Sequence, residues 1–123
     1  MNGIDNIIFS KSYSFALRTI KAYKYLTEEK KEFVLSKQML RSGTSIGAMV
    51  RESKFAQSKA DFINKLSVAL KEANETLYWL ELLHDSDYID DESFNSIHAD
   101  ANELTSLLAS IVRTTKNNCE NKS

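Results

Sequence analysis

The chain of 123 residues contains no proline, three glycines and one cysteine. Sandwiches and barrels of β-strands need turn-forming residues at many corners, so this scarcity argues against an all-β fold. The single cysteine, Cys119, cannot build a disulfide framework within the chain, which fits a reducing cytoplasm. No apolar run reaches the length of a membrane span, and no charged-then-apolar leader opens the sequence. We therefore expect a cytoplasmic protein with no membrane segment.

The chain also has only two histidines, which restricts the chemistry available to it. Glu81 and His84 form one E-x-x-H, the spacing that places two ligands on one helix face in di-iron bundles. The matching position before His98 is Asn95, so the second half of such a site is missing. A serine or cysteine nucleophile with a histidine base has no support either. The sequence predicts no metal, no cofactor, no small-molecule substrate and no enzymatic activity.

What the chain does contain is four amphipathic segments without a long linker, at about 10–28, 31–56, 58–84 and 90–115. Ser58 with Asp61 three residues later resembles a capping box, and acidic residues open the fourth segment. The polar tail after about residue 115 is expected to fray. Short connections favour antiparallel neighbours, so we predict one all-α domain over residues 1–123, an antiparallel up-down-up-down four-helix bundle.

The third segment has two apolar stripes at helical spacing, although a helix in a small bundle needs only one. The stripe that suits the core consists of Phe62, Leu66, Ala69, Ala73, Leu77 and Leu80. The second stripe contains Val68, Trp79 and Leu82, with Glu75 among them. Either the bundle rotates this helix to bury Trp79 in its own subunit, or another copy covers it. We favour a subunit contact, because an aromatic anchor among smaller apolar residues is typical of an interface centre.

The first segment is apolar on two sides as well. The side that we assign to the core consists of Tyr13, Ala16, Leu17, Ile20 and Tyr23. The remaining stripe is Phe15, Ala22 and Leu26. We predict that these three residues form the surface that meets Trp79 and its neighbours in an adjoining subunit.

Gly43 and Gly47 lie four residues apart in the middle of the second segment. Each costs about 1 kcal/mol of helix propensity relative to alanine, so some interaction must offset them. A phosphate-binding loop is one interpretation, but no strand precedes the glycines and no lysine has the required spacing. Close packing of another helix is the simpler interpretation, because a missing Cβ lets two backbones approach.

Charge is divided unevenly along the chain. Residues 1–60 contain 11 Lys/Arg and 5 Asp/Glu, whereas residues 61–123 contain 5 and 12. Three interpretations remain open: the halves neutralise each other within one bundle, adjoining subunits meet head to tail, or the basic half binds nucleic acid. Lys11, Arg18 and Lys21 form a basic strip that suits phosphate contact.

The string QMLRSGTSIGAMVRES, followed by SKADFINKLSVALKEANETLYWLELL, resembles a known family. It is similar to the four-helix-bundle proteins encoded within intervening sequences of bacterial 23S ribosomal RNA genes. The family's helix 2 pattern, R-S-x-x-S-I-x-x-N-I-x-E, is matched by Arg41, Ser42, Ser45, Ile46 and Glu52. Its helix 3 pattern is matched by Phe62, Leu66, Ala69 and Glu75. Met49 stands where the family usually has Asn.

This resemblance implies a bundle that assembles as a homopentamer. The accessory proteins of diversity-generating retroelements are distantly similar, and their pentameric barrels bind nucleic acid and a reverse transcriptase. From the two-sided helices and the resemblance we expect a non-enzymatic, ring-forming binding or scaffold protein. The alternative is an accessory protein that binds RNA or a ribonucleoprotein through the basic strip.

Overall fold

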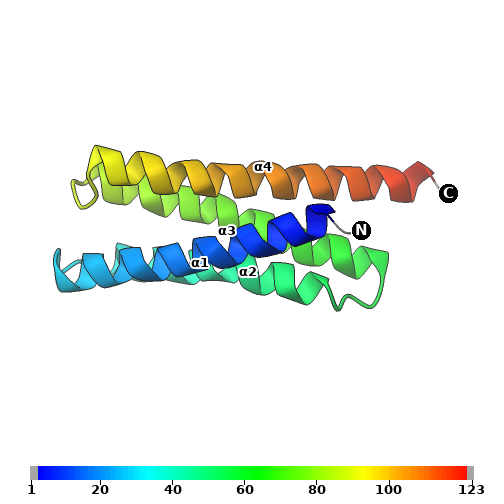
Figure 1. Cartoon of the computed structure of the whole chain (residues 1–123), viewed down its shortest axis with the longest axis horizontal. Coiled ribbons are helices and arrows are strands. Elements are labelled where there is room, and N and C mark those ends of the chain that lie inside the picture. The colour runs from blue at the N-terminus through cyan, green and yellow to red at the C-terminus, as the bar shows by residue number, and fades with distance from the viewer. Residues whose placement is uncertain (1–2, 122–123) are drawn as a thin grey trace.

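The computed structural model describes the chain from residue 3 to residue 121, and side-chain exposure from residue 7 to residue 118, so the side chain of Cys119 lies outside this account. The described chain is all-helical, with α1 (Gly3–Glu28), α2 (Leu35–Ser53), α3 (Lys59–Asp85) and α4 (Asp91–Asn121). Figure 1 shows both termini at the same end, with each helix running back along the previous one. The predicted all-α four-helix fold is confirmed.

The helix bounds differ from the predicted ones most where the sequence has no capping signal. Helix α3 lies within one residue of the expected 58–84, because Ser58 accepts a hydrogen bond from the N–H of Asp61 at 3.0 Å. Helix α1 begins earlier than expected, and α4 continues past residue 115 to Asn121. Helix α2 is shorter than the expected 31–56 at both ends.

The late start of α2 is explained by Glu32. Its buried carboxylate accepts hydrogen bonds from the N–H groups of Val34, Leu35 and Ser36 at 3.1, 2.9 and 2.7 Å. Helix N-termini leave such N–H groups without intrahelical partners, so Glu32 does the work of a capping side chain. Burial raises the pKa of Glu32, but the backbone hydrogen bonds outweigh it and hold the pKa below its usual range.

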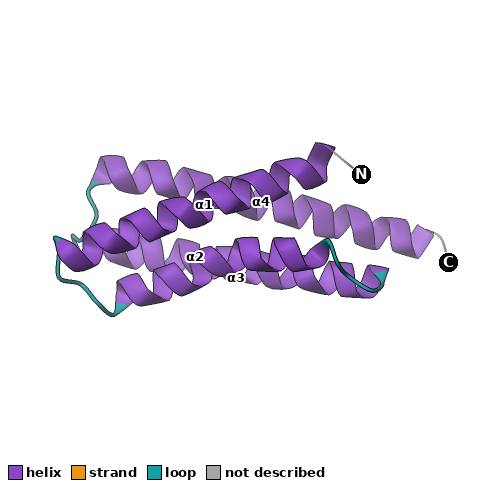
Figure 2. Cartoon of the chain, turned by 60° about the horizontal axis from the view of Figure 1, so that its bottom comes forward, coloured by secondary structure: helices purple, strands orange, loops and turns teal. Residues whose placement is uncertain are grey.

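A continuous apolar core runs along the bundle axis and receives side chains from all four helices. Helix α2 packs closely on α3, α1 on α2, and α3 on α4, whereas α1 and α4 touch only sparsely. Figure 2 shows the α1–α2 and α3–α4 connections together at one end and the α2–α3 connection at the other. The seam between α1 and α4 is therefore the most open of the four.

The two glycines of α2 lie against α1. A Cβ added at Gly43 would come within 2.7 Å of the buried Thr19 side chain, and one at Gly47 within 3.3 Å of the Ser12 carbonyl oxygen. Both contacts are closer than ordinary van der Waals distance. At these two positions α2 approaches α1 too closely for a side chain to fit without a shift.

The prediction for the core side of α1 is wrong. Tyr13, Leu17 and Ile20 are exposed, and Phe15 and Leu26 belong to the core. The true core side is a line in steps of three and four: Ile8, Ser12, Phe15, Thr19, Ala22 and Leu26. Two of its members are polar, and their hydroxyls donate to carbonyls of their own helix, to Phe9 at 3.1 Å and to Phe15 at 2.8 Å. Because both hydroxyls are hydrogen-bonded within their own helix, burying Ser12 and Thr19 leaves no hydroxyl without a partner.

Among the helices that the structure describes, none combines the length and the apolar character needed to cross a membrane.

Candidate functional site

Helix α1 carries a row of exposed apolar side chains. Tyr13, Leu17 and Ile20 are 55%, 54% and 38% exposed and lie about one turn apart, and we refer to them as the outer stripe. Beside Tyr13, the contact of α1 with α2 forms a shallow groove of about 290 Å³, lined in part by Ala16, Gly47 and Ala48. Large apolar side chains beside a groove of small residues give a surface suited to a packed helix.

The residues first assigned to this surface must be corrected. Phe15 and Leu26 are 2% and 0% exposed, so neither is available to a second subunit. Ala22, the third residue of that predicted interface, is half-buried and lines a groove on the α4 side of α1. The reversal of the two faces of α1 moves its candidate contact surface to the outer stripe.

The second stripe of α3 is half-buried along its whole length: Val68, Glu75, Trp79 and Leu82 are neither in the core nor fully exposed. Trp79 packs against the core, and Tyr78 meets its ring edge-on at 5.0 Å between centroids. The indole Nε1 of Trp79 and the Oε1 of Glu72 are buried without a hydrogen-bond partner. Such unpaired buried atoms are uncommon in folded proteins. Both atoms are covered by their own subunit, so neither is open to a hydrogen bond from outside it.

Two residues of the basic strip are occupied by acidic partners on α4. Lys11 forms an ion pair with Glu103 at 3.2 Å, and Arg18 forms one with Asp100 at 2.6 Å. Lys21 is exposed and lies at the rim of the groove between α1 and α4. The basic first half of the chain thus meets the acidic second half in part within one bundle.

The residues considered for a metal site do not converge on one point. His84 contacts Asp91 at 2.6 Å and Asp85 at 3.0 Å, whereas Glu81 contacts the other histidine, His98, at 3.0 Å. The hydrogen bond to Asp91, followed by that to Asp85, raises the pKa of His84. Within the described residues, no group of three histidine, cysteine or acidic side chains is placed to hold a metal ion.

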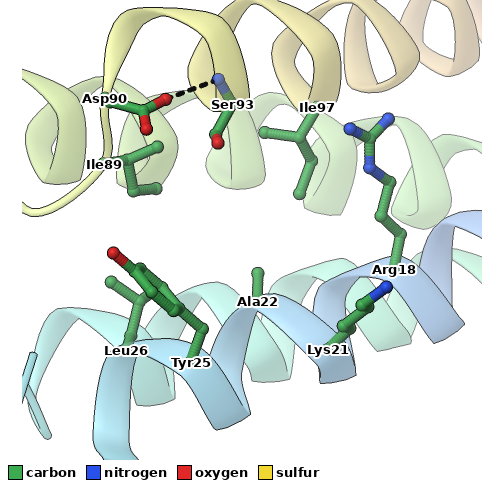
Figure 3. Close-up of a pocket in the computed structure, with 9 residues that line it drawn as sticks. All are labelled: Arg18, Lys21, Ala22, Tyr25, Leu26, Ile89, Asp90, Ser93 and Ile97. Atoms are coloured by element: carbon green, nitrogen blue, oxygen red, sulfur yellow. Dashed lines mark hydrogen bonds between the residues drawn. The ribbon is translucent and has the colours of Figure 1, made fainter. Parts of the chain in front are cut away.

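Figure 3 shows a second concave surface, which we call the α1–α4 groove. It has a volume of about 420 Å³ and is bounded by α1 on one side and by the start of α4 on the other. Apolar side chains form its floor and charged side chains its rim; the lining residues are Arg18, Lys21, Ala22, Tyr25, Leu26, Ile89, Asp90, Ser93 and Ile97. The groove is where the sparse contact between α1 and α4 leaves space.

Comparison with known proteins identifies the family of this four-helix chain. The model of the 23S rRNA-intervening sequence protein family matches residues 4–110. The chain belongs to this family. The chain is also similar to a crystal structure from Bacteroides thetaiotaomicron, described as a protein of unknown function from the S23 ribosomal protein family. The identity is 58%, over 90% of this chain and 99% of that one, with a TM-score of 0.89. Comparison with curated proteins gives no match.

The motif of the 23S rRNA-intervening sequence proteins has a structural role here. Ile46 is buried in the core, and the Ser42 hydroxyl accepts a hydrogen bond from Thr76 of α3 at 2.8 Å. Glu52 forms an ion pair with Lys65 at 3.2 Å, which also joins α2 to α3. Met49, in the position where Asn is usual, is half-buried against the core. Ser42, Ile46 and Glu52 thus hold α2 on α3.

Proposed function

We propose that this chain is a non-enzymatic binding or scaffold protein of the cytoplasm that assembles with copies of itself into a ring, as a homopentamer. The observation that carries the proposal is the outer stripe of α1. Three large side chains are 38–55% exposed in the isolated subunit. Covering the rest of each is therefore worth about half of the 1.5–3 kcal/mol that full burial of an apolar side chain contributes. The five-fold ring number rests on the family resemblance.

The second stripe of α3 is the surface that we assign to the neighbouring subunit. It supplies Trp79, a half-buried aromatic residue among smaller side chains, as a large anchor. Helices α1 and α3 are not neighbours in the bundle, so one copy uses both surfaces at the same time. A contact between two different surfaces is head-to-tail, and such a contact generates a ring if the rotation closes.

Variants of the outer stripe test the assembly. Leu17→Glu places a charge in the middle of the stripe without entering the core, so it should lower the oligomeric state and keep the helical circular-dichroism signal. Phe55→Glu is the matched control, because Phe55 is 79% exposed but lies in the α2–α3 connection. Light scattering after size exclusion measures both. An assembly that survives Leu17→Glu unchanged contradicts the proposed surface.

The α3 side has its own test. Trp79→Phe removes the indole N–H and keeps most of the ring, whereas Tyr78→Phe removes only an exposed hydroxyl next to it. We expect the first variant to weaken assembly more than the second. If both variants assemble to the same extent as the unmodified chain, Trp79 is not part of the interface.

RNA binding through Lys11, Arg18 and Lys21 is the alternative function. The ion pairs of Lys11 and Arg18 with α4 reduce the positive charge that this strip offers to phosphates. Exposed ion pairs are weak, so RNA can compete for them, and its affinity should then fall steeply with salt. Filter binding of 23S rRNA fragments at about 50 mM and about 200 mM salt decides the matter. If the chain binds RNA in a salt-sensitive way and Lys21→Glu abolishes this binding, RNA binding replaces the scaffold role as the proposed function.

A further inference from the structure

We propose that the α1–α4 groove binds a small molecule with an apolar body and one anionic group, of the class of medium-chain monocarboxylates. This inference does not depend on the assembly proposed above. It rests on the shape of the groove, its apolar floor and the arrangement of charge along its rim.

The floor of the groove is apolar because three core residues reach it. Leu26, Ile89 and Ile97 are buried, and Figure 3 shows them on facing walls. Ala22 contributes only a methyl group to the lining, so it leaves the space between the walls unfilled. A volume of about 420 Å³ lies within the range of small-molecule sites.

The groove also has the length of a chain-like ligand. Arg18 and Leu26 are eight residues apart on α1, which is a distance of about 12 Å along a helix. Helix α4 runs in the opposite direction, so Ile97 faces the Arg18 end and Asp90 faces the Leu26 end. An extended aliphatic chain can therefore lie along the floor with its head group at one end.

The charges show which end takes the anion. Arg18 is held in place by Asp100 at 2.6 Å and by the backbone oxygen of Ser96 at 3.3 Å, and Lys21 lies beside it on α1. No ion pair engages Lys21 in the described part of the chain. Two cations and one carboxylate leave this end positive. A carboxylate there can accept charge-assisted hydrogen bonds from Lys21 and from the free guanidinium N–H groups.

The opposite end does not compete for an anion. The Asp90 carboxylate accepts the N–H of Ser93 at 2.7 Å and begins α4 as its cap. Its negative charge repels a second carboxylate, so the ligand is oriented in one direction. The expected occupant is thus a monoanion and not a dicarboxylate or a cation.

Binding at this groove is separable from assembly. Tyr13, Leu17 and Ile20 do not line it, and they point away from α4 on a different side of α1. A chain carrying Leu17→Glu should therefore bind the same ligand. Loss of assembly with retained binding, or the reverse, distinguishes the two proposals.

The test uses three probes with the full chain. Octanoate has both the apolar body and the anion, octanol has only the body, and acetate has only the anion. Ligand-observed saturation-transfer NMR and calorimetric titration should show saturable octanoate binding. Octanol should bind about tenfold more weakly, because it lacks the carboxylate. A tenfold change in affinity corresponds to the lower end of the free energy that one charge-assisted hydrogen bond contributes. Acetate should not saturate the protein.

Variants locate the site. Lys21→Gln should weaken octanoate binding about tenfold and leave octanol unchanged, because it removes one charge only. Ala22→Leu should abolish binding of both, since it fills the floor. The matched controls are Lys24→Gln and Ala99→Leu, at exposed positions outside the groove. Circular dichroism and the melting temperature verify that each variant folds.

The outcomes are decisive in both directions. The site is supported if Ala22→Leu removes octanoate binding and Ala99→Leu keeps it. The position of the anionic group is supported if Lys21→Gln weakens octanoate binding. The absence of saturable octanoate binding at millimolar concentration overturns the proposal. Equal binding of octanol and octanoate, or binding that Ala22→Leu leaves intact, overturns it as well.

Discussion

Helix α1 contacts the bundle through two seams that are built in opposite ways. Against α2 it packs closely, because a Cβ added at Gly43 would meet the Thr19 side chain and one added at Gly47 would meet the Ser12 carbonyl oxygen. Against α4 it packs sparsely: two exposed ion pairs, at 3.2 and 2.6 Å, join the helices, and an open groove lies beside Arg18. The first seam is held by close packing and the second by exposed charge.

The difference indicates which side of the bundle can accept a ligand or move. Tight van der Waals contacts tolerate no change in shape, whereas exposed ion pairs contribute little and weaken with salt. We therefore expect stability to depend on the α1–α2 seam and ligand access to depend on the α1–α4 seam.

Gly43→Ala should cause the largest loss. The new Cβ would lie 2.7 Å from Thr19, whose buried side chain has little freedom to move. Because 2.7 Å is closer than real Cβ atoms approach, we expect the upper end of an overpacking cost of about 1–3 kcal/mol. The gain in helix propensity of about 1 kcal/mol leaves a net loss of about 2 kcal/mol. Gly47→Ala is the control, with its nearest contact at 3.3 Å. Urea unfolding should rank Gly43→Ala as less stable than Gly47→Ala, and the reverse order would contradict the account of this seam.

Glu32→Ala should cost about 1–2 kcal/mol of unfolding free energy, the usual range for the loss of a helix cap. Glu29→Ala, at an exposed position in the same turn, should be nearly neutral. Because the pKa of Glu32 is lowered in the folded state, its contribution is complete at neutral pH. It is lost as the pH falls below about 4. Thermal unfolding of both variants at neutral and acidic pH measures this, and a pH-independent difference would argue against the cap.

Arg18→Gln should change stability by less than about 1 kcal/mol, since it breaks an exposed ion pair across the open seam. The effect should shrink further in high salt. Urea unfolding at low and high salt measures both values. A loss as large as that of Gly43→Ala would show that the α1–α4 seam is structural and would remove the contrast between the seams.

The smallest effect concerns His84 in the last turn of α3. Its hydrogen bonds to Asp91 and Asp85 raise the pKa of His84, so its contribution to stability is complete below about pH 6. That contribution is lost as the pH rises through the raised value. Titration by NMR should show that Asp91→Asn lowers the pKa of His84, whereas Asp87→Asn does not. Equal titration curves in both variants would exclude the Asp91 contact in solution.

The sequence was sufficient to predict the four helices, and it predicted α3 best because Ser58 and Asp61 mark its start. It could not show which side of α1 is buried. Apolar residues of similar size lie on both sides of the helix. The buried side also contains Ser12 and Thr19, and polar residues of this kind usually indicate positions that face solvent. Their hydroxyls bond to their own helix, a compensation that residue periodicity does not display.

The same limit applies to the candidate sites. The glycine pair pointed to a close helix contact because Gly costs helix propensity, and the sequence alone could reveal that. The α1–α4 groove gave no signal, since it is formed where two helices that are distant in sequence contact each other only sparsely. The start of α2 was missed because a glutamate is not among the usual capping residues.

Native mass spectrometry of the unmodified chain at micromolar concentration tests directly whether the chain assembles with copies of itself. One chain has a mass of 14.0 kDa. Assembly of five copies predicts a species of five times 14.0 kDa, present across the concentration range and split by Leu17→Glu. A single species of 14.0 kDa at every concentration would show that the outer stripe of α1 needs no second copy, and would contradict the account.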